Sequence, residues 1–210
     1  DFEKLKFINF SKCQSLVCSP DLSYIPNFEE LNFYMCKNLE HVHASIANHC
    51  KLRKLNLEGC HLSEVEFLEI LSCPRLFILK LSRNNFTTLP TLERLNDLEE
   101  LEVSDCQQLQ EIPKILGKLR RLEGNNCKSL TRIPSNICDV GDVELYSSWD
   151  WKLVRNGFPV NHLFMPEKFH CQPNHRVVLP GGEMPKWLLP NKEDYISFVA
   201  SKDLYEKILG

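Results

Sequence analysis

Apolar side chains recur along this chain in a fixed short pattern, L-x-x-L-x-L-x-x-C, in which most x positions are polar. Apolar residues two positions apart, such as Leu79 and Leu81, point to the same side of a β-strand. Each copy of the pattern therefore predicts one short strand whose apolar side is buried. The pattern occurs six times, and its closing residues follow one another at intervals of 21 to 24 positions: Cys13, Cys36, Cys60, Asn84, Cys106 and Cys127.

The spacing of these copies indicates the architecture. A repeat of about 20 to 29 residues with this pattern is typical of leucine-rich repeats. One coil cannot bury its own apolar edge, so it needs neighbours, and the end coils need caps. We call each copy of the pattern a ladder. The first ladder begins at Phe2 or Leu5 with no polar cap before it, from which we infer that the chain is a piece of a longer protein. We predict an α/β leucine-rich-repeat solenoid with a curved parallel sheet and an irregular or short-helical convex side.

The last third of the chain lacks the pattern. The repeats end near residue 140, so residues 1–140 are expected to form a solenoid of about six repeats. Residues 141–210 are then a second, smaller domain. Trp149 and Trp151 lie at this junction, either as anchors between the two domains or as ordinary core residues.

Cysteine usage and charge narrow the class of protein. Five of the ten cysteines take ladder positions, which predicts buried free thiols in a reducing compartment. Cys50 and Cys73 are expected to pack the convex side as small residues. The net charge of −3, without a concentrated basic stripe, argues against a nucleic-acid partner. No apolar run approaches the roughly 18 residues that span a bilayer, so no membrane partner is predicted.

Metal and catalytic sites are not indicated either. His49-Cys50, Cys60-His61 and His170-Cys171 are adjacent pairs, whereas zinc ligands usually stand two to four positions apart. We interpret them as cysteines beside surface histidines. None of G-x-x-x-x-G-K-[ST], G-x-S-x-G and H-E-x-x-H occurs. The sequence predicts no metal, no cofactor and no catalytic residue.

A candidate protein-binding surface follows from the ladder. Residues between the buried leucines face the concave side. Exposed aromatic side chains are common anchors of protein interfaces, although contact with another part of the same protein explains them equally well. Glu99, Glu100, Glu102 and Asp105 lie beside Arg120 and Arg121, and these charges are expected to pair across strands. The central column is Asn9, Asn32, Asn56, Lys80, Glu102 and Glu123, and the flanking columns hold Phe7, Tyr34, Met35, Phe77 and Ile78.

Several segments resemble a known family. Ser19-Pro20-Asp21-Leu22-Ser23 and Cys36-Lys37-Asn38-Leu39 resemble the repeats of plant intracellular immune receptors, the TIR-type nucleotide-binding leucine-rich-repeat class. A more specific match opens the family's post-repeat β-sandwich, which has the signature L-P-G-x-E-I-P-x-W-F. Met184 and Leu188 replace the usual isoleucine and phenylalanine, and the chain ends at Gly210, so the sandwich would be partial. The matching residues are Leu179, Pro180, Gly181, Gly182, Glu183, Pro185 and Trp187.

The resemblance implies a protein-recognition and autoinhibitory module of a receptor in the cytoplasm or nucleus. Its concave columns and the segment Leu179–Trp187 would contact a pathogen effector or the receptor's own nucleotide-binding and TIR domains. Binding would permit assembly of a receptor oligomer. NAD cleavage and nucleotide binding would belong to domains outside this chain.

Two other functions were considered. An extracellular leucine-rich-repeat receptor or inhibitor predicts the consensus N-x-L-x-G-x-I-P and paired cysteine caps, and neither occurs. An adaptor that presents substrates to a ligase would need an F-box, and nothing in the sequence resembles one.

Overall fold

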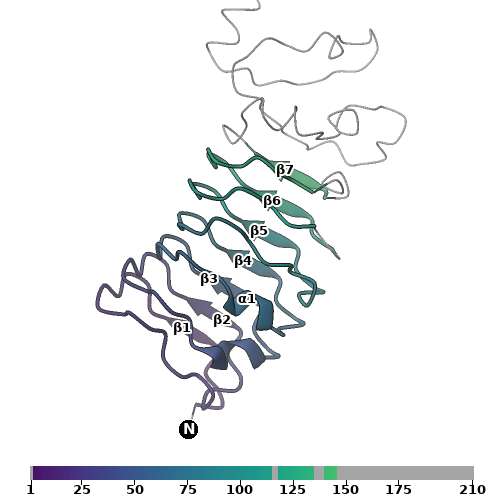
Figure 1. Cartoon of the computed structure of the whole chain (residues 1–210). Helices are drawn as coiled ribbons and strands as arrows, with labels where there is room; N and C mark the ends of the chain where they lie inside the picture. Colours follow the sequence, from purple (N-terminus) through teal and green to yellow (C-terminus); the bar gives the residue numbers. More distant parts are fainter. Residues whose placement is uncertain (1, 115–117, 135–139, 146–210) are drawn as a thin grey trace, which may run out of the picture.

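The computed structural model describes residues 2–114, 118–134 and 140–145, which form a single parallel sheet built up coil by coil. Its seven strands stack in sequence order, each hydrogen-bonded to the strands of the coils before and after it (Figure 1). This is the predicted leucine-rich-repeat solenoid. The strands are β1 (Phe7–Asn9), β2 (Glu30–Asn32), β3 (Lys54–Asn56), β4 (Ile78–Lys80), β5 (Glu100–Glu102), β6 (Arg121–Glu123) and β7 (Asp142–Glu144).

The ladder residues form the core. The middle residue of each strand is buried, and in-register pairing places it opposite its counterparts, as for Leu31 between Ile8 and Leu55. Burying each such side chain contributes roughly 1.5 to 3 kcal/mol. Phe28 and Phe33 are among the largest fully buried side chains. Each coil thus closes its apolar face only against its neighbours, as the repeat pattern predicted.

After each of the strands β1 to β6 the chain turns in the same way. Lys12, Met35, Arg83, Asp105 and Asn126 have φ between 58° and 62° in these turns, and Gly59 has 69°. This left-handed backbone costs a residue with a side chain some energy, so the surrounding bonds must hold it in place. After β2 to β6 this turn delivers the closing residue to the interior, whereas Cys13 after β1 is exposed.

The closing residues tie each coil to the one before it. The Cys36 thiol donates to the carbonyl of Phe10 (2.9 Å), and the Cys60 thiol donates to that of Phe33 (3.1 Å). Cys106 bonds the Leu81 carbonyl at 3.4 Å. A small donor at this place satisfies a buried carbonyl that has left the ladder, which explains the predicted preference for cysteine or asparagine. Burial raises the pKa of the Cys60 and Cys106 thiols to about 12.

The return segments are mostly irregular. In the described part of the chain, helical turns occur at η1 (Ala44–Asn48), between β2 and β3, and at α1 (Phe67–Ile70), between β3 and β4. The Ser72 amide joins them through the Ala47 carbonyl at 2.8 Å. An irregular or short-helical side opposite the sheet was predicted and is found.

The sheet continues past residue 140, where the repeats were expected to end. Val140, Val143 and Leu145 take the ladder positions of a seventh coil and are buried. The pattern missed it because the closing position holds Ser148 instead of cysteine or asparagine. Leu145 fills the space beside Gly124, where a Cβ would lie 2.7 Å from its Cδ2. The predicted β-sandwich, its motif Leu179–Trp187, Trp149 and Trp151 lie outside the described residues.

Three expectations about single side chains were wrong. Cys13 is exposed, although the other four ladder cysteines are buried, because among the described residues no earlier coil packs against it. Cys50 is also exposed, whereas Cys73 is buried as predicted. His49, predicted to be a surface histidine, is only 7% exposed.

Candidate protein-binding face

The outward side chains of the seven strands make up what we call the strand face. Each strand contributes its first and third residues, since the middle one points inward. In-register pairing aligns the third residues in one row, so the predicted central column is a real structural unit. Glu144 of β7 extends this row, and the sequence analysis missed it together with its strand.

The asparagine side chains of the row are hydrogen-bonded to nearby backbone amides. The side-chain oxygens of Asn9, Asn32 and Asn56 each accept a hydrogen bond from the amide two residues later, at 2.9 to 3.0 Å. This short loop is the one that asparagine forms readily at the end of a strand. It keeps the oxygen against the backbone and leaves the amide nitrogen as the group that a partner can reach.

In later coils a serine hydroxyl replaces the asparagine oxygen as the acceptor for this backbone amide. Where the row changes to glutamate, the Ser82 hydroxyl accepts from the Ser104 amide at 3.0 Å. The Ser104 hydroxyl accepts from the Asn125 amide at 3.1 Å. Because each serine comes from the preceding coil, the side chains of Glu102 and Glu123 are released from the backbone. The sequence signal is the paired change of asparagine to glutamate and of a larger residue to serine.

The released glutamates lie next to one another and to two cations. The Lys80 ammonium is 2.7 Å from a Glu102 carboxylate oxygen, and the Arg121 guanidinium is 2.6 Å from that of Glu123 and 3.5 Å from that of Glu144. Burial raises the pKa of Glu123, and the charges of Glu102 and Glu144 raise it further against the opposing effect of Arg121. The row thus changes from neutral at β1 to β3 to charged at β4 to β7.

The expected pairing of charges across strands is found in part. Arg120 pairs with Glu99 of the previous coil at 3.0 Å, and Arg83 lies 3.5 Å from Asp105. Arg121 pairs within its own strand and with the next one, and it forms no ion pair with Glu100. Exposed pairs of this kind contribute about 0.2 to 1 kcal/mol each.

The five apolar flanking residues do not form one cluster. Phe7 and Ile78 share a column, but three strand spacings separate β1 from β4, about 14 Å. Phe7 is 65% exposed, and the others are half-buried. Met35 lies in the turn after β2 with its sulfur beside Gly59, and Tyr34 precedes it. Phe77 lies just outside β4, at the edge of the sheet.

One polar cluster in the return segments has the residue types of a catalytic triad but not its geometry. The Nδ1 atom of His43 is 2.9 Å from the Ser45 hydroxyl and 3.9 Å from an Asp21 oxygen. A triad needs the acid and the nucleophile on opposite ring nitrogens. The Ser45 oxygen also accepts the amide of Leu22 at 3.0 Å. These residues cap the turn that leads into η1.

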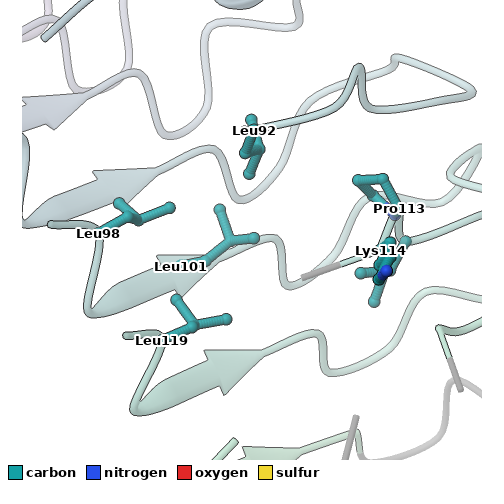
Figure 2. A pocket seen from close by; sticks show the side chains of 7 residues that line it. Leu92, Leu98, Leu101, Pro113, Lys114 and Leu119 are labelled. Atoms are coloured by element: carbon teal, nitrogen blue, oxygen red, sulfur yellow. The ribbon is translucent and has the colours of Figure 1, made fainter. Parts of the chain in front are cut away.

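A small space between apolar side chains in the interior is too narrow to hold a ligand. Figure 2 shows Leu92, Leu98, Leu101 and Leu119 around a small apolar space beside Pro113. Its volume is about 20 Å³, which is near that of one water molecule. It belongs to the core between the fourth, fifth and sixth coils.

No group of three or more His, Cys, Asp or Glu side chains in residues 2–114, 118–134 and 140–145 could hold a metal ion. No helix in the same residues has the length and apolar character needed to cross a membrane.

Comparison with known proteins identifies the repeats. A family model described as the leucine-rich repeats of RPS4B-like disease resistance proteins matches residues 39–150, more than half of the chain. The chain belongs to this family. The resemblance to plant resistance receptors found in the sequence is therefore confirmed for the repeats. The motif at Leu179–Trp187 lies outside the matched residues and stays a prediction.

Individual relatives are resistance proteins of plants. TMV resistance protein N of Nicotiana glutinosa is 26% identical over 178 residues, which are 72% of this chain and 16% of that protein. Disease resistance protein RPP5 of Arabidopsis thaliana is 33% identical over 136 residues, 63% of this chain and 8% of the relative. Disease resistance protein RPP4 of the same plant is 31% identical over 114 residues, 48% and 9% respectively. The chain thus spans less than a fifth of the length of each relative.

A solved structure of an internalin from Listeria monocytogenes is also similar, with 15% identity and a TM-score of 0.32. The match covers 63% of this chain and 54% of the internalin. The family match and the relatives thus agree that these are the leucine-rich repeats of a disease resistance protein.

Proposed function

We propose that this chain is the protein-recognition and autoinhibitory module of an intracellular plant immune receptor. In this proposal the strand face contacts a pathogen effector or the receptor's own nucleotide-binding and TIR domains. Recognition releases the receptor to assemble into a signalling oligomer. The segment Leu179–Trp187 is a second proposed contact, on the strength of the sequence motif alone.

The observation that carries the proposal is the composition of the strand face. Packing uses the inward residues of the strands and leaves the outward ones free to vary, yet two outward places hold the large apolar side chains of Phe7 and Ile78. Tyr34 is half-buried in the turn directly after β2, where its amide donates to the side-chain oxygen of Asn32 in the central row. Such partly exposed anchors in a preorganised polar setting suit a protein partner.

The cysteines support a location in the cytoplasm or nucleus. Among the described residues, Cys13, Cys18 and Cys50 are exposed and form no disulfide. Exposed thiols that are not oxidised to disulfides suit a reducing compartment better than an oxidising one.

The test uses the full-length receptor with Tyr34→Ala and Ile78→Ala combined. A matched control, Tyr24→Ala with Ile70→Ala, removes the same side-chain types from the return segments, where Tyr24 is 82% and Ile70 is 49% exposed. Cell death in leaves is scored with and without the pathogen, and receptor accumulation is measured by immunoblot.

Either a constitutive response or a loss of recognition, absent from the control, supports the proposal. The first shows that the strand face restrains the receptor's own domains, and the second shows that it contacts the effector. Normal accumulation with an unchanged response would remove the strand face from the mechanism.

A further inference from the structure

A second surface runs along the N-terminal ends of the strands, across consecutive coils. It is a groove of about 450 Å³, and we call it the edge groove. Its walls come from the short stretches directly before β2 to β6, so consecutive coils each add one or two side chains. None of the central row of the strand face lines it. The two surfaces can therefore be altered separately.

The carboxylates of the edge groove already have cationic partners. Glu29, at one end, pairs with Lys6 at 2.7 Å. At the other end Asp97 pairs with Lys118 at 3.1 Å and Glu99 pairs with Arg120 at 3.0 Å. Lys6 and Arg120 lie outside the groove lining. Glu29 and Glu99 are therefore ion-paired with cations that are not part of the groove lining.

The cations in the middle of the groove lack such partners. Lys51, Arg53 and Arg75 are exposed, and none has a carboxylate within ion-pair distance among the described residues. Lys51 instead donates to the neutral side-chain oxygen of Asn27. Three positive charges on two adjacent coils therefore face solvent without a directly paired carboxylate, although Lys51 and Arg53 are near enough to Glu29 to help lower its pKa after Lys6, the main cause.

An apolar side chain lies among these charges. Phe77 follows Arg53 along the groove by one coil, since its backbone amide bonds the Arg53 carbonyl at 2.8 Å. It is half-buried, and Leu76 and Leu79, not Phe77, fill the core. Phe77 thus lines the groove together with Arg53 and Arg75.

We propose that the middle of the edge groove docks an acidic segment of a partner protein, with an apolar side chain of that segment packed on Phe77. Arginine forks bind carboxylates in a bidentate manner, and aromatic side chains anchor interfaces. The paired carboxylates at both ends limit the positive stretch to two coils. A short acidic peptide fits that length, whereas a continuous phosphate backbone would run into the acidic ends. The inference rests on the proposed function, because it gives the chemistry of one partner of a recognition module.

The experiment measures binding of a fluorescein-labelled peptide, with a leucine between glutamates, to the 210-residue chain by fluorescence anisotropy. Arg53→Glu combined with Arg75→Glu should weaken binding about tenfold or more. The matched control, Lys37→Glu with Arg94→Glu, makes the same change in net charge at exposed residues outside the groove. Circular dichroism and thermal melting show whether both variants remain folded.

A second variant separates the apolar contact from the charges. Phe77→Ala should weaken binding of the leucine-containing peptide about fivefold and leave an all-glutamate peptide unaffected. Equal losses in the groove and control variants would overturn the proposal. So would a single-stranded oligonucleotide that binds as tightly as the peptide, since the groove would then be a general polyanion site.

Failure of this inference differs from failure of the proposed function. If peptide binding ignores Arg53 and Arg75 while Tyr34 and Ile78 still alter signalling in leaves, the groove is wrong and the strand-face proposal stands. If signalling ignores the strand face while the charge reversal abolishes peptide binding, the reverse holds.

Discussion

Asn84 shows how much a single position in this solenoid depends on its hydrogen bonds. It is 1% exposed and takes a place that cysteine fills in five of the other coils. Its amide nitrogen donates to the carbonyls of Leu57 (2.9 Å) and Leu81 (2.7 Å), and its oxygen accepts from the Leu62 amide (2.9 Å). A thiol can donate only one hydrogen bond, whereas the asparagine side chain both donates to several carbonyls and accepts from an amide.

We therefore expect Asn84→Ala to lower the free energy of unfolding by about 2 to 4 kcal/mol, because it leaves several buried backbone groups unpaired. Asn84→Cys should cost less than half of that, since its thiol can still bond the Leu57 carbonyl as Cys60 bonds that of Phe33. Urea denaturation under reducing conditions measures both. Equal losses in the two variants would mean that these bonds contribute little and that volume alone matters.

His49 is a residue whose role the sequence did not reveal. Its ring packs against Phe28 with centroids 4.2 Å apart, and its Nε2 atom has no hydrogen-bond partner. Burial lowers its pKa from the ordinary 6.5, although Asp21 opposes this. The folded chain therefore holds the neutral ring, whereas the unfolded chain takes up a proton near pH 6.5. Stability from this group is present above that pH and is lost as the pH falls towards the folded pKa.

Replacing the ring should remove this part of the pH dependence. We expect His49→Leu, of similar apolar bulk, to lose less stability than the parent chain between pH 7.5 and pH 5, by urea denaturation at both values. The carboxylates titrate alike in both proteins, so the difference isolates the histidine. Identical losses would show that His49 is protonated without cost in the fold.

At the scale of the element, the repeat pattern predicted the features that arise within one strand. It did not predict the features that depend on contacts between neighbouring coils. The alternation around Leu31 or Leu79 gave the strands and their inward side, because it arises within one strand. β7 was missed since its coil closes without cysteine or asparagine. The replacement of asparagine caps by Ser82 and Ser104 was also missed, because those bonds join different coils and depend on register.

The edge groove belongs to the same class of missed features. Its charges are separated by about one repeat in sequence, and only the stacking of coils shows which pair and which do not. Arg120 was expected to have acidic neighbours and does, whereas the unpartnered Arg53 and Arg75 gave no local signal. The burial of His49 depends likewise on Phe28 in the preceding coil.

Adjacent residues of β4 test the division between inward and outward sides. Leu79 is fully buried, and Ile78, next to it, is half-buried on the strand face. Leu79→Ala should cost about 3 kcal/mol through the cavity it leaves, whereas Ile78→Ala should cost less than about 1 kcal/mol. Thermal and urea unfolding give both values. A large loss at Ile78 would mean that this side chain supports the fold and that the strand face is less free to bind than we infer.

At the scale of the whole molecule, the chain is a one-dimensional stack. Each strand bonds only to the strands of adjacent coils, and no element crosses from one end of the sheet to the other in the described residues. The stability of such a stack is approximately a sum of coil and nearest-neighbour terms. A defect in the middle should consequently weaken its neighbours first and reach the ends with reduced effect.

Leu79→Ala places such a defect in the fourth of seven coils, and hydrogen–deuterium exchange can follow how far it spreads. The amides of Leu57 and Leu81, bonded to the carbonyls of Lys80 and Glu102 at 2.9 and 2.7 Å, flank the altered residue. The Phe10 amide, bonded to the Asn32 carbonyl at 2.8 Å, reports on the first coil. We expect faster exchange at Leu57 and Leu81 with a smaller change at Phe10, and no change at any of them in Ile78→Ala. Equal acceleration at all three amides would show that the solenoid opens as one cooperative unit. A contact on the strand face would then be felt along the whole stack, because binding at one coil would stabilise every other coil to the same extent.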